Sequence, residues 1–226
     1  MLMNSVSQRA ARTVKKSIFK NVINSGKKIM TTQSSLKKLF SIGLLALACC
    51  ALPSQAVEVG GVKIDDAATV EGQALKLNGA GIRTKFVFKV YAMGLYLADQ
   101  KGTTADVQAL PGAKRIKIVM MREVASDELA KSFVTALNNN SSAAEKAKFS
   151  DQTQKFEKMF SAMAAVKKGD VITLDWLPAT GTVSQFNGKP LSEPLPDAAF
   201  YNALLRIWLG QKPADDELKT ALLGAK

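Results

Sequence analysis

Residues 85–98, KFVFKVYAMGLYLA, constrain the fold most, because they have the pattern of a long strand without a polar face. Successive side chains of a strand point to opposite faces of the sheet. One face would carry Lys89, Tyr91, Met93, Leu95 and Leu97, and the other Phe86, Phe88, Val90, Ala92 and Tyr96. Since neither set is polar, the sequence predicts a strand that is covered on both sides.

The remaining patterns place strands around a central helical region. Further strands are predicted at 57–65, as a hairpin around Gly60-Gly61, and at 68–78, 115–122, 170–178 and 180–186. A first helix is predicted to begin at a Ser126 cap. A second is predicted at 143–167, where apolar residues recur at i, i+3, i+4 and i+7. Two more are predicted at 197–209 and at 214–223. Strands and helices do not alternate as in βαβ units. The order therefore predicts an α+β fold with a mostly antiparallel sheet.

The N-terminal quarter has the features of a targeting segment. Lys37 and Lys38 precede an apolar run, and Ser54-Gln55-Ala56 follows it as a cleavage-site triplet. This is the pattern of a secretory signal peptide, and the run is shorter than the roughly 20 apolar residues of a membrane span. We interpret residues 30–56 as a signal peptide, leaving residues 57–226 as one domain without a stable membrane span. Lipidation at Cys49 or Cys50 fits the pattern less well.

The basic residues 1–29 are interpreted as an over-extended start, with a mitochondrial-type leader as the alternative. The expected location of the mature protein is the periplasm or outside the cell. Nine Lys and Arg residues and no acids lie within residues 1–56, so the net charge of +12 falls to 22 − 19 = +3 in the mature chain. The high overall pI therefore does not indicate nucleic-acid binding.

The mature chain contains neither His nor Cys. Zinc, copper and haem sites lose their usual ligands, and Ser-His-Asp or Cys-His catalysis is excluded. We expect no metal and no cofactor.

Three segments resemble the bacterial chalcone isomerase-like proteins, and together they span most of the mature chain. They are GAGIRTKFVFKVYAMGLYLAD (79–99), RIKIVMMREV (115–124) and FNGKPLSEPLPDAAFYNALLRIWLGQKPADDELKTALLG (186–224). The resemblance implies an open-faced β-sandwich, in which a large antiparallel sheet is covered by helices and the ligand cleft lies between the two layers.

The resemblance also implies candidate site residues. Arg83 matches the arginine that anchors an anionic ligand in both the isomerases and their fatty-acid-binding relatives. Tyr91 matches a strand position that helps to order a water in the isomerases, and Ser192 matches a late polar position. The isomerases place a catalytic tyrosine at the start of a later helix, where this chain reads VASDELAKSF without a tyrosine.

The residues themselves leave alternatives open. Arg83 could instead face solvent or pair with Glu71 or Asp99, and Tyr91 could be a core tyrosine bonded to a backbone carbonyl. In one straight strand Arg83 and Tyr91 would lie roughly 26 Å apart, so a small shared ligand requires a turn between them. The Gly79-Ala80-Gly81 segment is interpreted as a bend or bulge, and the stripe LLRIWLG (204–210) as packing.

Three functions remain from this reasoning. The first is an exported protein that binds a small apolar acid or phenolic ligand through Arg83, Tyr91 and Ser192. The second is an isomerase or intramolecular lyase, in which Arg83 would hold a phenolate and Tyr91 would polarise a carbonyl. The third is a non-catalytic interaction protein with a filled cleft. The sequence leaves the oligomeric state open.

Overall fold

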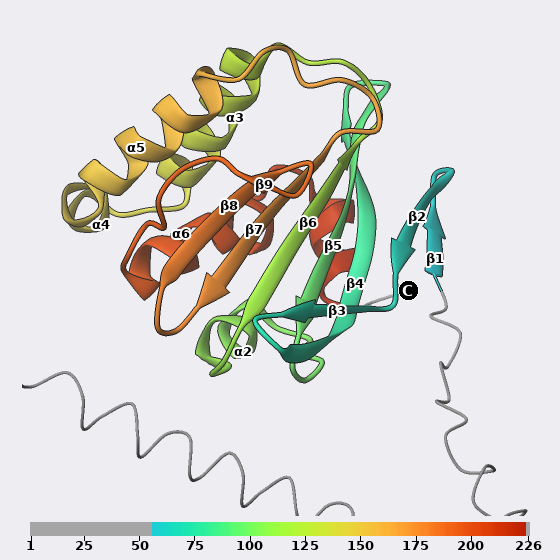
Figure 1. Cartoon of the computed structure of the whole chain (residues 1–226), viewed down its shortest axis with the longest axis horizontal. Coiled ribbons are helices and arrows are strands. Elements are labelled where there is room, and N and C mark those ends of the chain that lie inside the picture. The colour runs from blue at the N-terminus through green and yellow to red at the C-terminus, as the bar shows by residue number, and fades with distance from the viewer. Residues whose placement is uncertain (1–55, 225–226) are drawn as a thin grey trace, which may run out of the picture. The chain divides into compact units, whose positions relative to one another are not determined.

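The computed structural model describes residues 56–224 of the chain. The predicted leader and signal peptide, residues 1–29 and 30–56, therefore lie outside the described residues except for Ala56. Helix labels begin at α2, as in Figure 1.

A seven-stranded antiparallel sheet forms the centre of the described fold, with strand order β3-β4-β5-β6-β7-β8-β9 (Figure 1). Its strands are β3 (Ala67–Val70), β4 (Gln73–Lys85), β5 (Phe88–Leu97), β6 (Lys114–Met120), β7 (Val171–Leu177), β8 (Gly181–Phe186) and β9 (Lys189–Pro190). A separate hairpin consists of β1 (Ala56–Val59) and β2 (Val62–Asp65), and turns at Gly60-Gly61 as the sequence predicts. The strands follow one another in chain order, which confirms the predicted α+β fold with an antiparallel sheet.

The helices supply the other layer. They are α2 (Thr104–Ala109), α3 (Ser126–Asn139), α4 (Ala143–Lys148), α5 (Ser150–Ser161), α6 (Ala198–Leu209) and α7 (Asp216–Leu222). Apolar side chains of α3, α5, α6 and α7 form one buried cluster with one face of the sheet. A smaller cluster lies on the opposite face, where Ile64 of β2 packs with Ala92 and Tyr96 of β5. The strand predicted to be apolar on both faces is covered on both from Val90 to Leu97.

Three predicted segments are divided in the structure. The expected strand over residues 68–78 is interrupted by a turn at Glu71-Gly72, which separates β3 from the start of β4. The expected strand over residues 85–98 is interrupted by a turn at Phe86-Val87, so Phe86 and Phe88 are exposed rather than covered. The expected helix over residues 143–167 breaks at Phe149, whose buried side chain ends α4 and precedes α5, and α5 ends at Ser161.

Ser126 does not cap α3 as predicted. The N-cap residue is Ala125, without a side-chain hydrogen bond, and the Ser126 hydroxyl donates instead to the carbonyl of Met163 at 2.7 Å. The reason is that Val124 and Val166 form a backbone bridge, which brings the segment after α5 alongside the start of α3.

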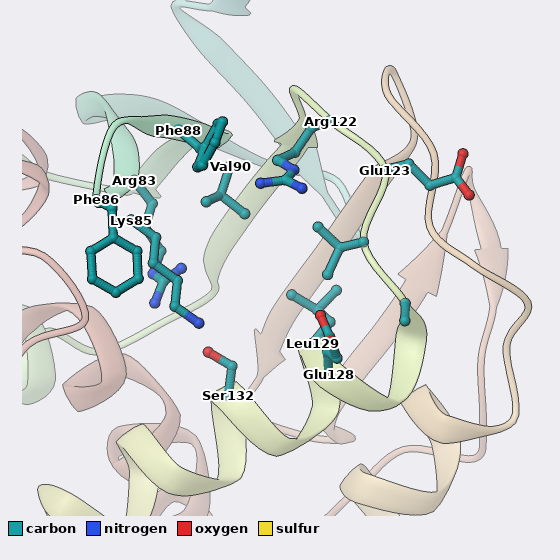
Figure 2. A pocket seen from close by; sticks show the side chains of 12 residues that line it. Arg83, Lys85, Phe86, Phe88, Val90, Arg122, Glu123, Glu128, Leu129 and Ser132 are labelled. Carbon is teal, nitrogen blue, oxygen red and sulfur yellow. The ribbon is translucent and has the colours of Figure 1, made fainter.

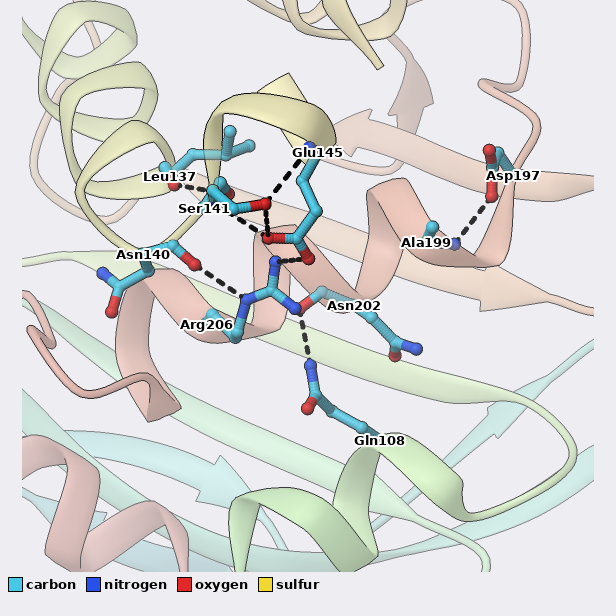
Figure 3. A network of polar contacts seen from close by, with 10 residues as sticks. Gln108, Leu137, Asn140, Ser141, Glu145, Asp197, Ala199, Asn202 and Arg206 are labelled. Atoms are coloured by element: carbon cyan, nitrogen blue, oxygen red, sulfur yellow. Dashed lines mark hydrogen bonds and ion pairs between the residues drawn. The ribbon is translucent and has the colours of Figure 1, made fainter. Parts of the chain in front are cut away.

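A polar network joins the helices at the far end of α3 (Figure 3). Arg206 of α6 donates to Glu145 at 2.7 Å and to the carbonyl of Asn140 at 3.0 Å. Gln108 of α2 donates to the carbonyl of Asn202 at 2.9 Å. These contacts hold α6 against the turn between α3 and α4.

The last helix lies along β4. A register shift at Asn78 interrupts the pairing of β4 with β5, and the Asn78 amide donates to the carbonyls of Leu222 at 2.7 Å and Lys101 at 3.0 Å. At the other end of α7, the Asp215 carboxylate caps the helix and also accepts from the backbone N–H of Thr84 at 2.8 Å. The bulge predicted near Gly79 is therefore present, and helix α7 is fastened to β4 at both ends.

Candidate functional site

A surface pocket of about 550 Å³ lies between the β4–β5 hairpin and the start of α3, and we call it the hairpin pocket. Its apolar lining consists of Phe86, Phe88, Val90, Val124 and Leu129, together with Ala125. Its polar lining consists of Arg83, Lys85, Arg122, Glu123, Glu128 and Ser132. Figure 2 shows Arg83 and Lys85 extending from the hairpin toward α3, where Ser132 faces them, while the Glu123 carboxylate points away.

A second hollow of about 530 Å³ continues along α3, and we call it the α3 groove. It shares Arg83, Lys85, Glu128 and Ser132 with the hairpin pocket. The remaining lining comes from α3 and from the loop before α7, and includes Lys131 and Lys212. The two cations of β4 thus stand where the hairpin pocket meets the α3 groove.

The local sequence explains why Arg83 and Lys85 reach this place. Gly79, Gly81, Arg83 and Lys85 alternate along β4 and so share one face. A Cβ built at Gly81 would lie 2.9 Å from Ala221 and Leu218 side-chain atoms, so only a residue without a side chain lets α7 pack there. Beyond the N-terminus of α7, this face of β4 is no longer covered by the helix. It can therefore carry the long side chains of Arg83 and Lys85.

Arg83 and Tyr91 are direct cross-strand partners. The separation of roughly 26 Å that one straight strand would give does not apply, because the chain reverses at Phe86-Val87 and so supplies the turn that a shared site requires. The Arg83 guanidinium carbon lies 5.8 Å from the centre of the Tyr91 ring, which is within the range of a cation–π interaction. A second register shift follows Arg83, so that adjacent Val90 and Tyr91 both belong to the cluster under the helices.

The Tyr91 side chain is only 1% exposed and lines neither the hairpin pocket nor the α3 groove. Its hydroxyl accepts a hydrogen bond from the indole N–H of Trp208 at 2.7 Å, rather than bonding to a backbone carbonyl. Burial raises the pKa of Tyr91 to about 12, although the charge of Arg83 acts in the opposite direction. Tyr91 is therefore a neutral phenol at neutral pH, placed behind Arg83 in the core.

Arg83 has no ion-pair partner within residues 56–224, and pairs with neither Glu71 nor Asp99. The lining of the two hollows contains five cations, Arg83, Lys85, Arg122, Lys131 and Lys212, and two carboxylates, Glu123 and Glu128. The excess of positive charge and the unpaired guanidinium favour an anionic group at this position.

Ser192 lies elsewhere. Together with Lys155, Met159 and Leu195 it lines a third hollow. This third hollow shares no lining residue with the hairpin pocket or the α3 groove. The Ser192 hydroxyl donates to the carbonyl of Glu193 at 2.8 Å and contacts the Met159 sulfur at 3.2 Å. Of the three candidate residues, the structure brings Arg83 and Tyr91 together and leaves Ser192 apart.

No group of three acidic, His or Cys side chains in the described range is arranged to hold a metal ion. None of the helices in residues 56–224 is long and apolar enough to span a membrane.

The chain belongs to the chalcone isomerase-like family, whose sequence profile matches residues 56–224. The structure is similar to that of a fatty-acid binding protein of Arabidopsis thaliana, with a TM-score of 0.59 and 16% sequence identity. That similarity covers 75% of this chain and 96% of the plant chain. No curated protein matches the sequence. The family and the similarity confirm the fold that the sequence predicts, an antiparallel sheet covered by helices.

Sequence reasoning missed several residues of the site. Lys85 was detectable, because it follows Arg83 by two positions and so shares its face. Arg122 and Ser132 carried no signal of their own, since their approach to Arg83 depends on how α3 returns over the sheet. Trp208 was read as part of an apolar stripe, which is correct for its ring but does not reveal its hydrogen bond to Tyr91.

Proposed function

We propose that this protein binds a small apolar ligand with one anionic end, of fatty-acid or phenolic type, in the hairpin pocket. The observation that carries the proposal is the half-buried Arg83, which has no ion-pair partner among the described residues and lines a pocket in which six of the twelve lining residues are apolar. The anionic end would bind Arg83 and Lys85, with Ser132 opposite as a further hydrogen-bond donor. The name of the similar Arabidopsis protein, a fatty-acid binding protein, supports the same class of ligand.

The dimensions of the site agree with such a ligand. A volume of about 550 Å³ lies within the range of small-molecule pockets, roughly 300–1,000 Å³. The interior between the sheet and the helices is instead filled by aromatic rings, with Phe133 packed edge-on against Phe160 at 5.5 Å and Trp208 at 5.6 Å. We therefore place the apolar part of the ligand along Phe88, Val90 and Leu129 rather than deep between the layers.

The position of Tyr91 favours binding over isomerisation. An isomerase would need a phenol or an ordered water next to the reacting carbonyl. The Tyr91 hydroxyl is instead held by Trp208 inside the core and lines neither hollow. We assign Tyr91 a supporting role, in which its ring keeps the Arg83 guanidinium in place.

Arg83→Ala is expected to weaken binding of an anthroyloxy-labelled fatty acid about tenfold. A hydrogen bond to a charged group contributes roughly 1.5–3 kcal/mol, and a tenfold change in affinity corresponds to about 1.4 kcal/mol. Arg83→Lys should lose less, since it keeps the charge but not the planar fork. The measurement is a fluorescence titration of each purified variant.

Two controls make this result specific. The methyl ester of the same probe lacks the charge, so the wild-type protein should prefer the acid and Arg83→Ala should not. Lys146→Ala removes an exposed cation of α4 that lines none of the hollows described above, and should bind as the wild type does. Equal affinity of wild type and Arg83→Ala for the acid would contradict the anchor role. Cyclisation of a hydroxylated chalcone above the rate in buffer would favour the isomerase instead.

We also propose that the protein is exported after removal of residues 30–56, together with any residues before them. The support is the order of basic residues, apolar run and small-residue triplet over residues 37–56. N-terminal sequencing of the protein from the periplasm or medium of an expressing bacterium should begin at Val57. Recovery of the chain with residues 30–56 intact in the cytoplasmic fraction would contradict export.

A further inference from the structure

The apex of the β4–β5 hairpin is formed by three consecutive large apolar residues that have no cover. Phe86 is 89% exposed, Val87 84% and Phe88 57%. In the rest of the described chain, the only other large apolar side chain with comparable exposure is Val57, at 48%. An exposed apolar patch of this kind marks an interaction site more often than a packing defect.

The backbone conformation at the apex is unusual for an aromatic residue. Phe86 has φ of 57°, in the left-handed region that asparagine and glycine occupy more readily than a bulky side chain. Two-residue hairpin turns usually contain these small residues. Folding alone would favour Asn or Gly at this position, so the aromatic ring points to a function of the apex itself.

Basic side chains flank the apolar apex. Lys85 and Lys89 are exposed on either side of it, and the Arg122 guanidinium carbon lies 5.0 Å from the centre of the Phe88 ring. No carboxylate occurs within residues 83–89. The nearby acids Glu123 and Glu128 line the hairpin pocket, and the Asp215 carboxylate already accepts backbone hydrogen bonds from Thr84 and Leu218. An apolar apex flanked by cations is complementary to a surface that is apolar inside and anionic outside.

We propose that this apex docks on a lipid bilayer containing anionic lipids. Phe86, Val87 and Phe88 would insert below the headgroups, while Lys85, Lys89 and Arg122 would lie at the level of the phosphates. A second protein is a poorer occupant, because Phe86 and Phe88 bury roughly 150–250 Å² each and Val87 is smaller. A stable interface needs about 800 Å² from each partner. A bilayer accepts a protruding tip without a matching groove.

Docking would also place the hairpin pocket against the membrane. Phe86 and Phe88 belong both to the apex and to the lining of that pocket, as Figure 2 shows for their position beside Arg83 and Arg122. An apolar acid could then pass between bilayer and pocket without crossing water. This last step rests on the proposed function, whereas docking of the apex does not.

Cosedimentation with vesicles tests the proposal. The full chain is expressed, and wild type and variants are purified in the form that the cells accumulate. Wild-type protein should bind vesicles of phosphatidylcholine and phosphatidylglycerol mixed two to one, and should bind less in high salt or to phosphatidylcholine alone. The triple change Phe86→Asn, Val87→Ser and Phe88→Ser should lower the partition coefficient at least tenfold. Since these side chains are exposed, the variant should fold.

Matched variants distinguish binding through the apex from non-specific adsorption to the vesicles. Val57→Ser removes the other exposed apolar side chain and should leave binding unchanged. Lys85→Gln with Lys89→Gln should reduce binding to the anionic vesicles several-fold, whereas Lys146→Gln with Lys155→Gln should not. Binding by the triple variant equal to that of the wild type would overturn the proposal, as would an effect of Val57→Ser as large as that of the triple change.

A probe placed at the apex reports insertion directly, independent of any contribution from residues 1–55. Val87→Trp should show vesicle-dependent quenching by brominated phosphatidylcholine, because its indole would lie among the acyl chains. Ala144→Trp on α4 should not, and Trp176 and Trp208 contribute the same background to both variants. Absence of quenching at position 87 would overturn insertion.

Two further measurements separate the remaining outcomes. A dimer in sedimentation velocity that the triple change dissociates, without vesicle binding by the wild type, would assign the apex to a second copy and overturn the proposal. Vesicle binding by a protein that fails to bind the labelled fatty acid in solution would uphold docking and contradict the proposed function.

Discussion

Replacement of Gly79 by alanine is expected to lower the free energy of unfolding by about 3 kcal/mol, the upper part of the range for overpacking. A Cβ at this position would collide with the carbonyl oxygen of Ala221 and would lie 2.8 Å from the carbonyl carbon of Leu222. Both atoms belong to the backbone of the last helix, so no side-chain rotation can relieve the clash. Either α7 moves away from β4 or the strand bends.

The measurement is urea unfolding followed by circular dichroism, with Gly102→Ala as the matched control. A Cβ at Gly102 meets only the carbonyl oxygen of Leu223, at 3.9 Å, which is an ordinary contact. Gly102→Ala should therefore stay within about 0.5 kcal/mol of the wild type. If the two variants were equally stable, close packing of α7 on β4 would be refuted.

Trp208→Ala is expected to cost about 3–5 kcal/mol of stability, as for other large core residues. The side chain is fully buried, packs edge-on against Phe133 with rings 5.6 Å apart, and donates to the Tyr91 hydroxyl. Its removal leaves a cavity next to Tyr91 on β5, the cross-strand partner of Arg83. Ligand affinity should fall as well, because Tyr91 would lose the contact that fixes its ring.

A double-mutant cycle isolates the hydrogen bond from the packing. Tyr91→Phe leaves the indole N–H of Trp208 buried without an acceptor, which costs roughly 1–3 kcal/mol. Once Trp208→Phe has removed the N–H, Tyr91→Phe should cost less, so the two changes should couple by about 1 kcal/mol in urea unfolding. Additivity within roughly 0.5 kcal/mol would show that the bond contributes little.

The sequence indicated the architecture because most strands and helices carry local signals. Gly60-Gly61 turns the first hairpin, Asn187-Gly188 turns another, and Asp197 caps α6, each as the residue type suggests. The family resemblance pointed to Arg83 and Tyr91. These predictions rest on properties of single residues and their near neighbours.

The errors occurred where tertiary contacts overrule local pattern. No Gly, Asn or Pro marks the turn at Phe86-Val87, so the strand predicted over residues 85–98 was extended across it. Phe149 breaks a helix because its ring is drawn into the core against Phe200, with ring centres 6.0 Å apart. The sequence left open whether Arg83 and Tyr91 meet, because their pairing depends on that turn. Such features depend on which segments meet in space, and periodicity does not contain that information.

The attachment of α7 to β4 has a consequence for the order in which the chain is synthesised and folds. Asp215 and Thr84 are 131 positions apart, yet their hydrogen bond lies one residue from Arg83. A chain synthesised from its N-terminus presents the arginine long before the helix that steadies its strand. Contacts this distant in sequence form late in folding. The surroundings of Arg83 are therefore complete only after the final segment has been synthesised, so a chain that still lacks α7 should not hold this arginine in its final position.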